Sequence, residues 1–124
     1  MKDLSLEGSA KTPTIDFKSE GELLIKGRSI PENSIEFYKP LIDWISEYSE
    51  NPKGQTLVNI QLEYFNTSSS KCILDVFKKL ESISESEVSI KWFYEEDDED
   101  MLEAGEDYEA IIDLKFEMIE VEEL

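Results

Sequence analysis

The spacing of apolar residues changes from a strand period to a helix period at Asn66, and this change constrains the fold most strongly. From Thr56 to Phe65, apolar side chains occupy every second position: Val58, Ile60, Leu62 and Tyr64. Four hydroxyl residues, Thr67–Ser70, come next, and the apolar residues after them recur at helical spacing: Cys72, Ile73, Val76, Phe77 and Leu80. The two periods predict a strand followed directly by an amphipathic helix from about Ser68 to Ser84.

The same reasoning predicts the remaining elements. Strands are expected at residues 4–6, 14–17, 22–26, 88–94 and 112–118, and further helices at about 35–48 and from about 98 to 108. Asn33 or Ser34 is expected to cap the first helix. Pro40 should kink this helix or mark its true start, because proline has no backbone N–H to donate. Gly105 is expected to interrupt the last helix.

This order of elements is typical of an α/β fold with crossover connections. We expect a single domain over residues 1–124, with a mixed central sheet and about three helices in a second layer. Loops that follow parallel strands meet at one edge of a sheet. Residues 30–34, 66–70 and 95–100 are therefore expected to converge there as the functional edge.

The chain contains no histidine and one cysteine, Cys72. Ser/His/Asp and Cys/His catalysis are thereby excluded, and no zinc site can be assembled. An EF-hand template laid from Glu95 fits poorly, because its glycine position falls on Asp100. We therefore expect no enzymatic activity, no bound metal and no cofactor.

Charge is distributed unevenly along the chain, whose formal net charge is −18. Residues 95–124 hold 15 acidic residues against the single base Lys115. Such a surface repels nucleic acid and anionic membranes and suits a basic partner protein. No apolar stretch approaches the ~20 residues of a membrane span, so a soluble, cytoplasmic protein is expected.

The hydroxyl run at the predicted helix start has two interpretations. Thr67 or Ser68 could serve only as the helix N-cap, the common role of a hydroxyl residue at this place. Alternatively, one hydroxyl could accept a phosphate, because free backbone N–H groups and the helix dipole favour negative charge there. The position alone leaves both interpretations open.

Four segments resemble the SiaC family of bacterial regulatory phosphoproteins, in the same order along nearly the whole chain. They are Pro31-Glu32-Asn33-Ser34, Leu41-Ile42-Asp43-Trp44, Tyr64-Phe65-Asn66-Thr67-Ser68-Ser69 and Trp92-Phe93-Tyr94-Glu95. The resemblance implies a STAS-like fold, similar to that of anti-sigma factor antagonists, which carry a phosphorylatable hydroxyl at this junction.

The resemblance also implies a function. Family members are phosphorylated by a protein kinase and dephosphorylated by a PP2C-type phosphatase, and the unphosphorylated form activates a diguanylate cyclase. By position, Thr67 is the phosphoacceptor, flanked by Asn66, Ser68 and Ser69. Residues expected to contact partners lie in the three converging loops and the strands before them: Pro31, Glu32, Asn33, Ser34, Tyr64, Tyr94, Glu95 and Asp97.

An anti-sigma factor antagonist with the same phosphoswitch is the alternative function. Its usual acid–serine–serine–glycine signature is absent, because Asn66 stands in place of the acid and no glycine precedes the helix. In either case a phosphate on Thr67 would join the six carboxylates of residues 95–100 at one edge. Like charges brought together in an interface cost several kcal/mol, so an acidic partner would be released.

Overall fold

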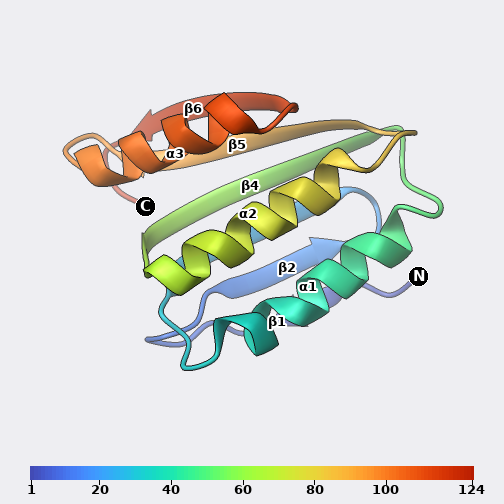
Figure 1. Cartoon of the computed structure of the whole chain (residues 1–124), viewed down its shortest axis with the longest axis horizontal. Coiled ribbons are helices and arrows are strands. Elements are labelled where there is room, and N and C mark those ends of the chain that lie inside the picture. The colour runs from blue at the N-terminus through green and yellow to red at the C-terminus, as the bar shows by residue number, and fades with distance from the viewer.

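The computed structural model describes all 124 residues and contains one six-stranded sheet with three helices. The strands lie in chain order across the sheet: β1 (Leu4–Leu6), β2 (Thr14–Lys18), β3 (Glu22–Ser29), β4 (Gln55–Phe65), β5 (Glu87–Glu95) and β6 (Lys115–Val121). The helices are α1 (Ser34–Tyr48), α2 (Thr67–Glu81) and α3 (Glu99–Ile111). The predicted two-layer α/β fold with a mixed sheet is confirmed, because all three helices cover one face of the sheet (Figure 1).

Strand direction explains where the helices begin. Strands β1, β2 and β3 pair antiparallel, whereas β3, β4, β5 and β6 pair parallel. Each parallel pair is joined by one helix, so α1, α2 and α3 all start at the carboxyl ends of strands, at one edge of the sheet (Figure 1).

The core lies between the sheet and the helices. It is one cluster of 24 buried residues, and its aromatic members link neighbouring elements. The Phe77 ring of α2 lies 5.1 Å from the Tyr108 ring of α3, and the Trp44 ring of α1 lies 5.4 Å from the Phe17 ring of β2. Aromatic pairs in these edge-on arrangements add to the free energy gained from burial, so they stabilise the packing of α1 on the sheet and of α2 against α3.

Several predicted boundaries were wrong. Strand β3 continues past Gly27 to Ser29, because Gly27 adopts a positive φ of 119° and still pairs with Leu62. Helix α1 begins at Ser34 and passes through Pro40, so Pro40 does not mark its start. Pro40 and Glu36 are both exposed, so water can bond the Glu36 carbonyl that has lost its helical donor.

Two helices and the last strand also differ from the prediction. Helix α2 ends at Glu81, with Ser82 as its C-cap, rather than at Ser84. Helix α3 is continuous through Gly105, which is buried against Trp92, and β6 begins only at Lys115. Gly105 is thus a close-packing residue: a Cβ atom there would lie 2.5 Å from Trp92 Cδ1.

A bulge in β4 reverses the predicted position of Tyr64. Gly27 pairs with Leu62 and Arg28 with Tyr64, so Glu63 is the extra residue. Beyond this bulge Phe65 packs against Trp92 on the helix side, with ring centroids 6.2 Å apart. Tyr64 is 49% exposed and lies under the Arg28 guanidinium instead of continuing the buried row from Val58 to Leu62.

Candidate functional site

Asn66 is the N-cap of α2, and no hydroxyl residue has that role. Its Oδ1 accepts a hydrogen bond from the Ser69 backbone N–H at 2.9 Å, and its own N–H donates to the Ser29 carbonyl. The interpretation of Thr67 or Ser68 as only the N-cap is therefore excluded. The amide cap leaves all four hydroxyls, Thr67–Ser70, inside the first turn and free for other contacts.

Ser68 joins the starts of two helices. Its hydroxyl lies 2.7 Å from the Ser34 hydroxyl in the first turn of α1, and it donates a longer bond to Asn66 Oδ1. Ser34 is 6% exposed, and Asn33 caps α1 by accepting a hydrogen bond from Glu36 N–H. The loops that precede α1 and α2 are thus held together, as the sequence predicts.

Ser69 is fully buried and belongs to a hydroxyl network under α1. Its Oγ donates to the Ser29 carbonyl at 3.0 Å and accepts from Ser29 Oγ at 2.9 Å. Ser29 Oγ also lies 2.7 Å from the Tyr38 hydroxyl. Burial raises the pKa of Tyr38 well above its ordinary value, so the phenol is neutral. This network fixes the end of β3 to both helices.

Ser70 connects α2 to α3. The Tyr108 hydroxyl donates to the Ser70 carbonyl at 2.8 Å, and the Ser70 hydroxyl lies 3.1 Å from the same phenol oxygen. Burial also raises the pKa of Tyr108. The Ser70 hydroxyl is therefore used in packing of the two helices.

Thr67 differs from its three neighbours. Its side chain is exposed, and its hydroxyl makes no hydrogen bond to any other residue. Of the four hydroxyls in the run, only that of Thr67 is both accessible and unengaged. A group transferred to it would break no contact within the protein.

Thr67 opens into a hollow between the starts of α1 and α2, with a volume of about 630 Å³. Its rim is formed by Glu32, Asn33, Ser34 and Ile35 on one side and by Thr67, Ser68 and Lys71 on the other. A second hollow of about 310 Å³ shares Ile35, Cys72 and Asp75 with it and continues along α1. Ile35 is 78% exposed, so this surface offers apolar area beside the free hydroxyl.

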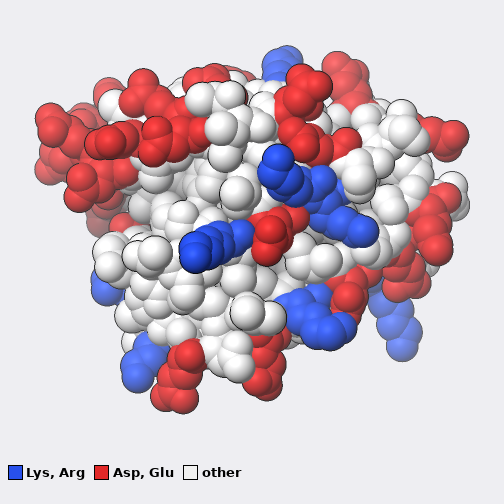
Figure 2. Space-filling view, in the orientation of Figure 1, with Lys and Arg blue, Asp and Glu red and all other residues white.

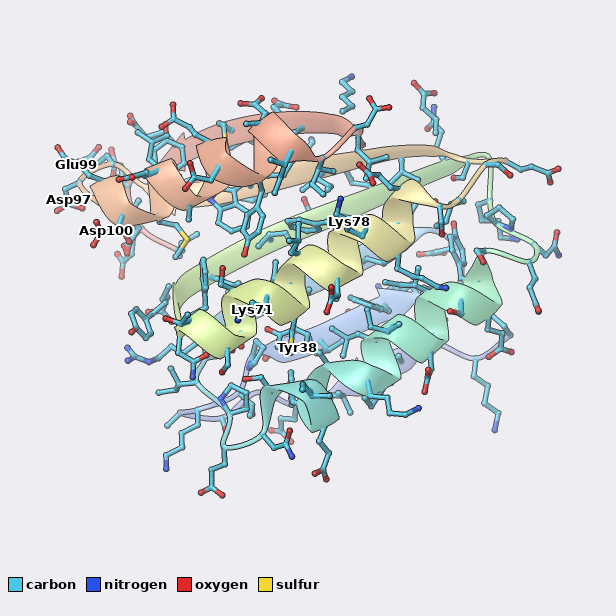
Figure 3. The ribbon with its side chains drawn as sticks, in the orientation of Figure 1. Tyr38, Lys71, Lys78, Asp97, Glu99 and Asp100 are labelled. Atoms are coloured by element: carbon cyan, nitrogen blue, oxygen red, sulfur yellow. The ribbon has the colours of Figure 1, made fainter.

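The third predicted loop does not reach this hollow. Strands β4 and β5 pair only as far as Ile60 and Trp92, so the ends of these strands separate. Asp97 is exposed in the loop that precedes α3, and it lies at the same edge of the sheet beyond the start of α2 (Figure 3). Residues 30–34, 66–70 and 95–100 thus lie at one edge of the sheet, as predicted, but no residue of 95–100 lines the hollow.

The other predicted contact residues are also dispersed. Pro31, Glu32, Asn33 and Ser34 lie in the loop and first turn beside Thr67. Tyr64 lies on the opposite face of the sheet, whereas Tyr94 packs against the core and Glu95 ends β5. None of Tyr64, Tyr94, Glu95 and Asp97 lines the hollow beside Thr67.

The sequence alone did not reveal several residues of the site. Ser29 lies outside the predicted strands and Tyr38 lies in the first predicted helix, and nothing local showed that their hydroxyls meet Ser69. Lys71 could have been found from the sequence spacing, because it stands four residues after Thr67 and so lies on the same side of the helix.

Charge on the helical face is organised around α2. Acidic side chains crowd the end of the molecule where α3 begins, whereas basic side chains lie over α2 in the middle of this face (Figure 2). Asp97, Glu99 and Asp100 belong to the acidic end, and Lys71 and Lys78 to the middle (Figure 3). None of the three helices is both long and apolar enough to cross a membrane.

The fold and the site together define a class: a two-layer α/β regulatory domain with one free hydroxyl at a strand-to-helix junction beside a shallow hollow. Residues 6–121 match the family model of the SiaC family regulatory phosphoproteins. The chain belongs to the SiaC family of regulatory phosphoproteins.

Known proteins agree with this assignment. An uncharacterized protein of Pseudomonas aeruginosa (strain UCBPP-PA14) is 33% identical over 112 residues, which span 87% of this chain and 88% of that protein. The solved structure of SiaC of Pseudomonas aeruginosa is similar with a TM-score of 0.89 and 29% identity, over 98% of this chain and all of that one. A crystal structure of diguanylate cyclase SiaD of Pseudomonas aeruginosa in complex with its activator SiaC is also similar. The match has a TM-score of 0.89 and 29% identity, over 96% of this chain and 100% of that chain.

Proposed function

We propose that this chain activates a diguanylate cyclase and that phosphorylation of Thr67 switches the activation off. The observation that carries the proposal is the match to the SiaC chain bound to the cyclase SiaD, which extends over 96% of this chain at 29% identity. The match is to a cyclase activator, and this favours a cyclase over a sigma-factor pathway as the target.

The assignment of Thr67 as phosphoacceptor is supported by the state of the four hydroxyls. Ser68, Ser69 and Ser70 each hold two elements of the fold together, whereas the Thr67 hydroxyl is exposed and unengaged. A kinase can therefore reach Thr67 without opening the domain. The first turn of α2 also favours the added negative charge.

The proposal includes a protein kinase and a PP2C-type phosphatase that set the phosphorylation state. The chain itself acts as a binding protein without catalytic activity and functions in the cytoplasm, where the GTP used by a diguanylate cyclase is found. Pro31, Glu32, Asn33 and Ser34 are proposed to contact the cyclase, because they surround Thr67 and lie beside the exposed Ile35.

Cyclase activation tests the switch directly. A diguanylate cyclase of the same organism that co-purifies with this chain is assayed for cyclic di-GMP synthesis with unmodified protein, Thr67→Ala, Thr67→Glu and protein that carries phosphothreonine at position 67. Unmodified protein and Thr67→Ala should stimulate synthesis, and the two charged forms should not. Equal stimulation by the phosphothreonine form would contradict the switch.

Phosphosite mapping in cells tests the acceptor. Mass spectrometry should locate phosphate on Thr67 in the native chain and in Ser70→Ala, a matched loss of a hydroxyl one turn into the helix. Thr67→Ala should carry no phosphate in this segment. Phosphate on a serine of the native chain, with Thr67 unmodified, would reject Thr67 as acceptor.

A further inference from the structure

Lys71 stands one helical turn after Thr67 and is the one basic residue that lines the hollow beside it. It is exposed, and it lies on the first turns of α2, whereas Lys78 lies two turns further along the helix (Figure 3). Residues four apart on a helix are neighbours, with Cβ atoms about 5–6 Å apart. The Lys71 ammonium can therefore reach a group attached to the Thr67 oxygen.

Lys71 is also free to make this contact. The single ion pair of the chain joins Lys39 and Asp43 in α1 at 2.7 Å. Asp75, one turn beyond Lys71, lines the same hollow without pairing with it. Other basic residues also lack an ion-pair partner, but Lys71 is the one that lines the hollow beside the proposed acceptor.

We propose that Lys71 forms an intramolecular ion pair with the phosphate of phosphorylated Thr67 and is the residue through which partners sense phosphorylation. This inference rests on the proposed function of Thr67. In the unmodified chain, the Lys71 ammonium is available to a carboxylate of the partner. In the modified chain, the phosphate, with about −1.5 to −2 charge, occupies that ammonium.

The charge of the hollow follows from this pairing. Its lining holds one cation, Lys71, against two carboxylates, Glu32 and Asp75. Once Lys71 is engaged by the phosphate, the hollow presents only negative charge to an approaching protein. Phosphorylation therefore removes an attractive contact and adds a repulsive one at the same place.

Titration of the phosphate tests the ion pair. Phosphothreonine is installed at position 67 during translation, so no kinase is needed, and the phosphate is followed by ³¹P NMR against pH. A nearby cation favours the dianion and lowers the second phosphate pKa. Lys71→Met should raise that pKa by about 0.3 of a pH unit, which corresponds to an exposed ion pair one turn apart on a helix.

Two further variants make the result specific. Lys78→Met removes a lysine from the same helix outside the hollow and should leave the phosphate pKa unchanged, and Lys71→Arg should keep it low. Glu32 and Asp75 raise this pKa in every variant alike, so they do not enter the comparison. Equal phosphate pKa values in Lys71→Met and Lys78→Met would overturn the ion pair.

The two proposals fail separately. If Thr67 carries no phosphate in cells, the proposed function fails, although the installed phosphothreonine can still pair with Lys71. If Thr67 is phosphorylated in cells and Lys71→Met leaves the phosphate pKa unchanged, only the ion pair is wrong.

Discussion

The hydroxyl oxygens of Ser34 and Ser68 lie 2.7 Å apart, although 34 positions separate these residues in the chain. This contact joins the first turns of α1 and α2, between which the hollow beside Thr67 is formed. A hydrogen bond between two short side chains thus links the two helix starts directly.

Removal of this contact should destabilise the protein modestly. Ser34→Ala leaves the Ser68 hydroxyl with only its longer bond to Asn66. We expect the free energy of unfolding, measured by urea denaturation, to fall by about 1 kcal/mol. Ser46→Ala makes the same change in α1 at a hydroxyl without a hydrogen bond and should have little effect. An equal loss in both variants would mean that the contact contributes nothing.

The buried network should show strong coupling between Ser29 and Tyr38. Ser29→Ala leaves the buried Tyr38 phenol without a partner, at a cost of about 1–3 kcal/mol, whereas the Ser69 hydroxyl keeps its bond to the Ser29 carbonyl. Tyr38→Phe added to Ser29→Ala removes this unpaired phenol. The double variant should therefore be more stable than the sum of the two single losses. Strict additivity in a double-mutant cycle would contradict the network.

Alkaline pH should destabilise the fold through Tyr38. Burial raises the pKa of this phenol in the folded chain above its unfolded value of about 10. Its contribution to stability is therefore intact below about pH 10 and is lost as the pH rises toward the folded pKa. Above about pH 10 the free energy of unfolding should fall about 1.4 kcal/mol per pH unit more steeply in the native chain than in Tyr38→Phe. Tyr64→Phe, which removes an exposed phenol, should keep the native slope, and a native slope in Tyr38→Phe would disprove the role of burial.

Close packing of α3 against the sheet depends on Gly105. A Cβ atom at this position would lie 2.5 Å from Trp92 Cδ1 and 2.6 Å from Met118 Cε, so Gly105→Ala must displace both side chains. Such overpacking costs about 1–3 kcal/mol, which thermal unfolding can measure. At Gly54 an added Cβ meets nothing within 4 Å, so Gly54→Ala is the matched control. A native melting temperature in Gly105→Ala would show that α3 can shift freely.

Much of the fold was predictable from periodicity, because each half-buried strand and amphipathic helix carries its own repeat. The change of period at Asn66 located the junction of β4 and α2 to within one residue. The position of Tyr64 was not predictable, since it depends on an extra residue in β4 opposite Gly27 and Arg28. Gly105 was misjudged as a break for a similar reason: a glycine is needed there because the Trp92 ring of another element packs closely against it.

The parts of the candidate site formed by residues adjacent in sequence were predictable. The parts formed by contacts between distant residues were not. Four adjacent hydroxyls at a helix start were visible in the sequence, as was their position beside residues 31–34. Which hydroxyl is free depends on partners 34 to 40 positions away, namely Ser34, Ser29 and Tyr108. The sequence did not show that β4 and β5 stop pairing at Ile60 and Trp92, or that residues 95–100 do not line the hollow.

Three hydroxyls of the run make hydrogen bonds within the fold, and the Thr67 hydroxyl makes none. This difference affects how fast the protein can change its signalling state. A phosphate on Thr67 costs the fold no hydrogen bond, so the modified and unmodified chains share one architecture. No segment has to unfold or refold when the group is added or removed. The lifetime of each signalling state is then set by the enzymes that add and remove the phosphate, and the response can be as fast as the turnover of these enzymes.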